Sequence, residues 1–84
     1  MTSSRPPRKI LVQNLNDTPF GLQIEPWAQY EKIAPNSRAE IIFDDNDEPL
    51  EFCLTEEGEP FFGINSDITF SIDGRVIFDS RKTK

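Results

Sequence analysis

The sequence contains no histidine, only one cysteine and no long hydrophobic run. Without histidine the commonest general base near neutral pH is missing, so Ser–His–Asp and Cys–His catalysis are excluded within one chain. Zinc or copper sites built on histidine ligands are excluded for the same reason. One thiol cannot form an internal disulfide, which favours a reducing compartment.

Apolar stretches are short throughout the chain. None approaches the ~18 residues of a membrane span or the apolar length of a signal peptide. The best candidate, Ile10-Leu11-Val12, is followed at once by polar residues. We therefore expect a cytoplasmic protein that does not enter a membrane.

Charge is distributed unevenly over the 84 residues. All 15 acidic residues lie between Asp17 and Asp79, and residues 10–80 contain only three basic residues, so this body carries a charge of −12. Such a body repels phosphate, and we expect no direct binding of nucleic acid. The other basic residues lie at the two ends, at Arg5, Arg8, Lys9, Arg81, Lys82 and Lys84.

The length and these charged ends predict one domain with two tails. We expect a flexible basic leader over residues 1–8, a single domain over residues 9–80 and a basic tail over residues 81–84. The alternative for the tails is that one of them folds onto an acidic partner.

Alternation of apolar and polar residues is the main pattern that the chain does contain. A period of two is typical of a half-buried strand. The clearest run is 20–25, and the next clearest are 67–72 and 75–79. Asp73-Gly74 separates those last two runs. A type I′ turn favours this dipeptide because both of its central residues need positive φ. The pattern therefore predicts a hairpin.

Further strands are expected at 9–15, 30–33, 38–44 and 50–54, separated by turns rich in proline and asparagine. Residues 61–65 are predicted to form an irregular edge segment. Six or seven short strands predict an all-β fold, a small antiparallel β-sandwich or a partly open barrel, and we favour the sandwich. The residues expected to point inward are Ile10, Val12, Phe20, Leu22, Ile24, Ala39, Ile41, Phe43, Leu50, Phe52 and Leu54.

The acidic loop 44–48 is the only candidate for a cation site. Carboxylates suit a hard cation, but Pro49 stands where an EF-hand requires glycine, and Thr55 stands where it requires glutamate. A solvated loop is the favoured interpretation, and we predict no metal and no cofactor. Carboxylate catalysis of the glycosidase type is disfavoured because the acids cluster in loops.

Apolar residues on the expected outer faces of strands break the alternation. They are Leu11, Ile42, Cys53 and Ile77, where a wet sheet face would be polar. Three interpretations are open. These residues are scattered singly, or they are covered by a tail or by Phe61-Phe62, or they form one contiguous surface that binds a partner. Cys53 is interpreted as a buried small hydrophobe and not as a nucleophile, because its neighbours are acidic.

The tripeptide Glu25-Pro26-Trp27 is the most distinctive local motif. Proline ends the strand, and the tryptophan either plugs the end of the sandwich or anchors an interface. With the apolar outer-face residues, it defines one candidate partner surface. This surface comprises Leu11, Trp27, Ile42, Cys53, Phe61, Phe62 and Ile77.

Three short motifs resemble a family of small uncharacterised bacterial all-β proteins. In order they are Asn14-Leu15-x-Asp17-x-Pro19, then Ile24-Glu25-Pro26-Trp27, and after Tyr30 to Ile33 the turn Ala34-Pro35-Asn36-Ser37. That family pairs an N-x-x-D-x-P turn with an E-P-W strand end and a P-x-x-S/G turn. The resemblance covers about residues 10–45, with Ala28 in place of the usual glycine, and implies a β-sandwich without an assigned activity.

Together these features favour a non-catalytic protein-interaction module or a small accessory subunit. The expected partner is another protein, or a second copy of the chain in a dimer, and no small-molecule site is predicted. Two alternatives remain open: an acidic inhibitor of the phage type that mimics nucleic acid, and a carboxylate-based sandwich that binds or hydrolyses sugars.

Overall fold

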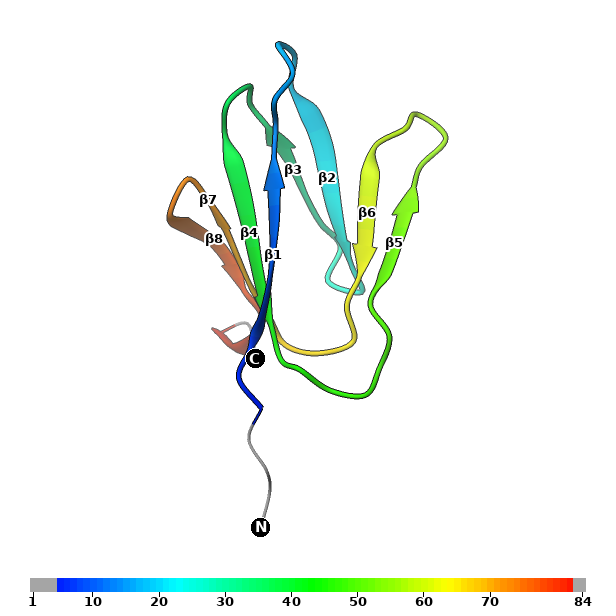
Figure 1. The fold of residues 1–84 in the computed structure, drawn as a ribbon, viewed down its shortest axis with the longest axis vertical. Helices are drawn as coiled ribbons and strands as arrows, with labels where there is room; N and C mark the ends of the chain where they lie inside the picture. Colours follow the sequence, from blue (N-terminus) through cyan, green and yellow to red (C-terminus); the bar gives the residue numbers. More distant parts are fainter. Residues whose placement is uncertain (1–4, 83–84) are drawn as a thin grey trace.

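Residues 5–82, which this computed structural model describes, form a sandwich of two four-stranded β-sheets (Figure 1). The expected all-β sandwich is confirmed, with eight strands in place of six or seven. Residues 1–4 of the expected leader and 83–84 of the expected tail lie outside the described residues. The strands are β1 (Arg8–Gln13), β2 (Phe20–Glu25), β3 (Gln29–Ile33), β4 (Arg38–Phe43), β5 (Glu51–Leu54), β6 (Pro60–Gly63), β7 (Ile68–Ile72) and β8 (Arg75–Asp79), and a short 3-10 helix, η1 (Ser80–Lys82), follows them.

The first sheet has the strand order β1-β4-β7-β8, and the second has the order β3-β2-β6-β5. Neighbouring strands run antiparallel except β2 and β6, which are parallel. The prediction of an irregular edge at 61–65 is wrong, because most of β6 lies there and β6 is an interior strand. Its consecutive phenylalanines point to opposite faces, as successive strand residues must, so that Phe62 is buried and Phe61 is half-buried on the outer face.

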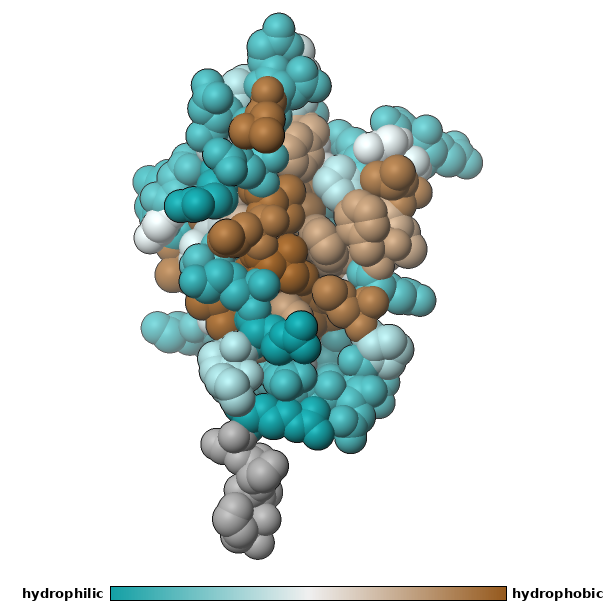
Figure 2. All heavy atoms as spheres, in the orientation of Figure 1, coloured by the Kyte–Doolittle hydropathy of each residue, from teal (hydrophilic) through white to brown (hydrophobic). Residues whose placement is uncertain are grey.

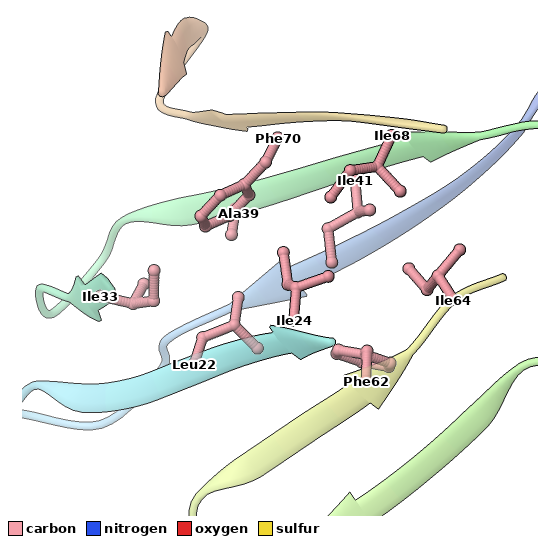
Figure 3. Packing of buried hydrophobic residues seen from close by; sticks show 9 residues of the cluster. All are labelled: Leu22, Ile24, Ile33, Ala39, Ile41, Phe62, Ile64, Ile68 and Phe70. Carbon is pink, nitrogen blue, oxygen red and sulfur yellow. The ribbon is translucent and has the colours of Figure 1, made fainter. Parts of the chain in front are cut away.

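The core lies between the sheets and is built from nine buried apolar residues (Figure 3). Figure 3 shows Leu22 and Ile24 of β2 pointing toward Ala39 and Ile41 of β4, and all four side chains are fully buried. The inward faces expected for β2 and β4 are therefore confirmed. Partly buried residues complete the packing, and these are Ile10, Val12, Phe20, Trp27, Phe43, Ile72, Ile77 and Phe78.

The inward face expected for β5 is not part of this core. Leu50, Phe52 and Leu54 are 43%, 59% and 63% exposed, so the prediction that they are buried is wrong. Phe52 does share a face with buried Phe62, with which it pairs. In Figure 1, however, the β5–β6 hairpin extends to the right of the other strands, which explains why the first sheet leaves the inner face of β5 uncovered.

A buried asparagine joins two loops at one end of the sandwich. Asn14, 2% exposed, donates from Nδ2 to the carbonyl oxygens of Thr18 and Ile33, both at 2.9 Å. Its Oδ1 accepts a hydrogen bond from the Asn16 backbone at 2.9 Å. The Asn14 backbone also forms hydrogen bonds with Ser37 and Asn36, in the turn between β3 and β4. All of its side-chain groups are therefore used to fix the chain between β1 and β2 against β3 and the turn after it.

The β7–β8 turn has the geometry that its sequence predicts. Asp73 and Gly74 have φ angles of 50° and 84°, as a type I′ turn requires. Ala28 also has a positive φ, of 55°. Ala28 therefore occupies a conformation that costs an L-residue about 1–2 kcal/mol.

The Asp73 carboxylate also ties this turn to the start of β4. It accepts hydrogen bonds from the Ser37 hydroxyl at 2.7 Å and from the Arg38 backbone at 3.0 Å. These two bonds, and the Arg38 charge, hold the pKa of Asp73 below its ordinary value of 3.8. Because the folded pKa is depressed, this carboxylate stabilises the fold above its unfolded pKa, and the effect is lost as the pH falls through the folded value.

Replacing Asp73 by asparagine is expected to flatten the acid limb of the stability curve. Asparagine accepts positive φ, so the turn is kept while the titrating charge is removed. Below about pH 4 the wild-type free energy of unfolding should fall more steeply than that of Asp73→Asn. Urea unfolding at a series of pH values measures this. Ser37→Ala removes the shortest hydrogen bond to the carboxylate, so its free energy of unfolding should fall with a slope between those of the wild type and Asp73→Asn. Equal slopes for all three proteins would contradict the role given to Asp73.

Candidate functional site

The expected partner surface does not form one patch. Leu11 is exposed and Ile42 half-buried on the outer face of the first sheet. Cys53 pairs with Phe61 across β5 and β6, on the outer face of the second sheet. The outer faces of a sandwich point in opposite directions, so these four side chains cannot be contiguous.

The other three residues of that surface belong to the interior. Phe62 is 8% exposed and lies in the core, and Trp27 and Ile77 pack against it. Ile77 is the extra residue of a β-bulge between Phe78 and Val76, and a bulge shifts the alternation by one position. The outward prediction for Ile77 is wrong for this reason. Trp27 lies in the turn between β2 and β3, and its ring is 6.1 Å from that of Phe78 in β8, as expected of a plug at the end of the sandwich.

The acidic loop 44–48 lies against the basic ends of the chain. An arginine guanidinium lies near each of its three aspartates. The sequence did not lead us to expect these ion pairs, although the ends are basic and the loop is acidic. Among the described residues, no group of three acidic or cysteine side chains is placed to hold a metal ion. The ion pairs are Arg5–Asp47 at 3.0 Å, Arg81–Asp44 at 2.8 Å and Arg8–Asp45 at 3.7 Å.

The inner side of β5 presents the most distinctive exposed surface. Phe52 and Leu54 of β5, with Leu50 directly before the strand, follow one another at alternate positions and are all exposed, and we call them the apolar row. Figure 2 shows hydrophobic surface extending from the middle of the molecule toward the β5 side, with hydrophilic surface above and below. The Phe52 ring lies 5.2 Å from that of Phe62, so the row is continuous with the core. An exposed apolar surface with a polar rim is typical of a protein-binding site.

The outer side of the same edge is acidic. Glu25, Gly63 and Glu51 stand side by side on β2, β6 and β5, and we call this group the acidic slot. Gly63 has no side chain, so a gap remains between the two glutamates, and Glu51 lies only 3.4 Å from where a Cβ at position 63 would be. An open pocket of about 350 Å³ lies here, and Phe61 and Glu48 also line it.

Over the part of the chain that the structure describes, the carboxylates of the acidic slot form no ion pair. The chain has no lysine or arginine between Arg38 and Arg75. Within residues 5–82, the ion pairs are formed by Arg5, Arg8, Lys9 and Arg81, and none reaches Glu25, Glu48 or Glu51. Glu25 accepts a hydrogen bond from the neutral Gln23 side chain, and Glu48 accepts one from Asn65. The pocket therefore favours a cationic group from outside.

Cys53 is exposed, so the prediction of a buried thiol is wrong. Its side chain lies on the outer face of an edge strand, opposite Phe61, where none of the residues 5–82 covers it. The alternation correctly places it on the face opposite Phe52. It could not show that both faces of this strand are open.

Residues 5–82 contain no helix that is long and apolar enough to cross a membrane. The resemblance to small bacterial all-β proteins stays a prediction. No protein-family model, curated protein or solved structure matches the chain.

Proposed function

We propose that this chain is a non-catalytic protein-interaction module that binds its partner through the apolar row of β5. The observation that carries the proposal is the exposure of Leu50, Phe52 and Leu54 along an edge strand that, among residues 5–82, pairs only with β6. Edge strands usually carry charged residues or prolines that discourage pairing. Within β5, only Glu51 is charged and none of the four residues is proline.

The composition supports a binding role over a catalytic one. Without histidine, the commonest general acid–base catalyst is missing, and Glu51 of the acidic slot is exposed to solvent at a sheet surface. A cytoplasmic location is part of the proposal, because a free thiol as exposed as Cys53 suits a reducing compartment.

Mimicry of nucleic acid is the weaker alternative. A mimic needs a continuous array of unpaired acids to fill a basic groove. Here Asp44, Asp45 and Asp47 of the most acidic loop already pair with arginines of the same chain. Binding through the apolar row should also lose less affinity at high salt than mimicry would.

Site-specific photo-crosslinking tests the proposal. We would place p-benzoylphenylalanine at position 52, or at the control position 76, where Val76 is 58% exposed on β8. Cells that produce the protein should yield a covalent adduct from position 52 and none from position 76. Leu54→Ser should lower the yield of the adduct, whereas Leu15→Ser, at a more exposed leucine outside the row, should not.

The affinity for the captured partner makes the test quantitative. Burying two side chains of this size contributes about 1.5 kcal/mol each, so Phe52→Ser with Leu54→Ser should weaken binding of the captured partner about a hundredfold. Absence of an adduct at position 52, equal adducts at both positions, or an adduct insensitive to Leu54→Ser would each reject the proposal.

A further inference from the structure

We infer that the partner of β5 is an extended protein segment with alternating apolar and basic side chains, added as a fifth strand to the second sheet. This inference rests on the proposed function and specifies the chemistry of its partner. It follows from three properties of the β5 edge: its unpaired backbone groups, the different character of its two faces, and its charge.

The ladder between β5 and β6 shows which backbone groups are unpaired. The Thr55 backbone donates to the Glu59 carbonyl at 2.9 Å, and these residues continue the register in which Cys53 opposes Phe61. In an antiparallel ladder, hydrogen-bonded pairs alternate with non-bonded pairs. Cys53 therefore bonds to β6, while Phe52 and Leu54 direct their N–H and C=O groups toward the open edge. Pro60, which lacks an N–H, lies opposite Leu54 at a non-bonded position, as this assignment requires.

The two faces of the edge differ in character. Phe52 and Leu54 lie on the inner face, whereas Cys53 and Glu51, a member of the acidic slot, lie on the outer face. A strand added to β5 would place alternate side chains on these two faces. Every second side chain would cover the apolar row, and those between would lie beside Glu51.

Charge determines what the outward side chains should be. Glu51 and Glu25 flank the empty position at Gly63, and the described residues offer neither of them a basic partner. Opposite charges facing each other across a strand pair are favourable, and like charges are unfavourable. Lysine or arginine is therefore favoured at the outward positions of the partner strand.

The same argument disfavours a second copy of the chain at this edge. Between Leu50 and Gly58 the hairpin carries Glu51, Glu56 and Glu57 and no basic residue. Pairing β5 with its own copy would bring these acids together. A nucleic acid is disfavoured for the same reason, because its phosphates would face the same carboxylates.

Short capped peptides provide the direct probe. The first is a six-residue peptide in which lysine and valine alternate. The second has the same composition with three lysines followed by three valines, and the third alternates glutamate and valine. Backbone amide shifts measured by NMR titration give both the affinity and the place of binding.

We expect the alternating basic peptide to bind at least tenfold more tightly than either of the others and to shift the amides of Phe52 and Leu54. Glu51→Gln should weaken it about threefold, the scale of one exposed charge pair. Added salt should weaken it further.

A pair of variants at one position separates strand addition from simple apolar contact. Leu54→Ala and Leu54→Pro both lose the leucine side chain, but only the proline loses the N–H that faces the open edge. Neither variant removes a β5–β6 hydrogen bond under the assignment above, and proline is tolerated on an edge strand at such a position. The alternating peptide should bind Leu54→Pro about fivefold or more weakly than Leu54→Ala, through loss of a backbone hydrogen bond.

The outcomes separate this inference from the proposed function. Equal binding of the alternating and block peptides, equal binding to Leu54→Pro and Leu54→Ala in folded protein, or no peptide binding would each overturn the inference. If the adduct at position 52 persists in that case, the proposed function stands with a partner of different chemistry. If Leu54→Pro does not fold, the comparison of the three peptides and Glu51→Gln decides the matter alone.

Discussion

Replacing Asn14 by alanine is expected to lower the free energy of unfolding by about 3 kcal/mol, because three polar groups lose their partner. The carbonyl oxygens of Thr18 and Ile33 and the backbone N–H of Asn16 all bond to this side chain. The total stability of a domain this size is about 4–12 kcal/mol. Tm should therefore fall by about 15 °C.

Asn16→Ala is the matched control for Asn14→Ala. Asn16 lies in the same loop, but it is exposed and its side chain bonds only the next backbone N–H, at 3.1 Å, among the bonds described. Its loss should change stability by less than about 0.5 kcal/mol. Urea unfolding followed by the fluorescence of Trp27, the single tryptophan, measures both variants. Equal effects of the two substitutions would show that Asn14 does not organise this end of the sandwich.

Phe70→Ala is expected to be more damaging still, at about 4 kcal/mol, because it removes a fully buried ring and leaves a cavity. Phe52→Ala should cost less than about 1 kcal/mol, since this ring is 59% exposed and its main aromatic contact is Phe62. Both residues are strand phenylalanines with apolar residues two positions away. Their alternation alone predicts similar costs, whereas the structure predicts a large difference.

Thermal and urea unfolding of the two phenylalanine variants measure this difference. If Phe70→Ala does not fold at all, Phe70→Leu, which leaves a smaller cavity, provides the comparison. A cost for Phe52→Ala similar to that at Phe70 would show that β5 is covered. The apolar row would then be part of the core and unavailable to a partner.

The sequence predicts those parts of the fold in which local pattern and local chemistry agree. The strand at 20–25 is found with the expected bounds, since its alternation is complete and Pro19 and Pro26 flank it. The last hairpin is found because Asp73-Gly74 specifies its turn. In both cases the information lies within a few residues of the element that it determines.

The errors concern relations between distant elements. Alternation in β5 shows that Phe52 and Leu54 share a face, but whether another sheet covers that face depends on how far the first sheet extends. The strand β6 was missed because its parallel partner, β2, lies 35 or more residues earlier in the chain. The burial of Asn14 could not be predicted, because asparagine in a turn is usually exposed.

The candidate site was predicted only in part for the same reason. The sequence places Cys53 and Phe61 in a partner surface, and both lie at the β5–β6 edge. It assigns Phe52 and Leu54 to the core, where a sandwich with complete sheets would hold them. The acidic slot is built from strands that only the topology brings together, so neither Glu25 nor Glu51 could be singled out.

Amide hydrogen exchange along β5 tests the central claim most directly. In the free protein, the N–H of Cys53 should be protected by β6, while those of Phe52 and Leu54 should exchange rapidly. Addition of the partner captured at position 52 should protect Phe52 and Leu54 and leave control amides such as that of Val76 unchanged. Protection of Phe52 and Leu54 in the free protein, or no gain in protection on binding, would contradict a docking edge at β5.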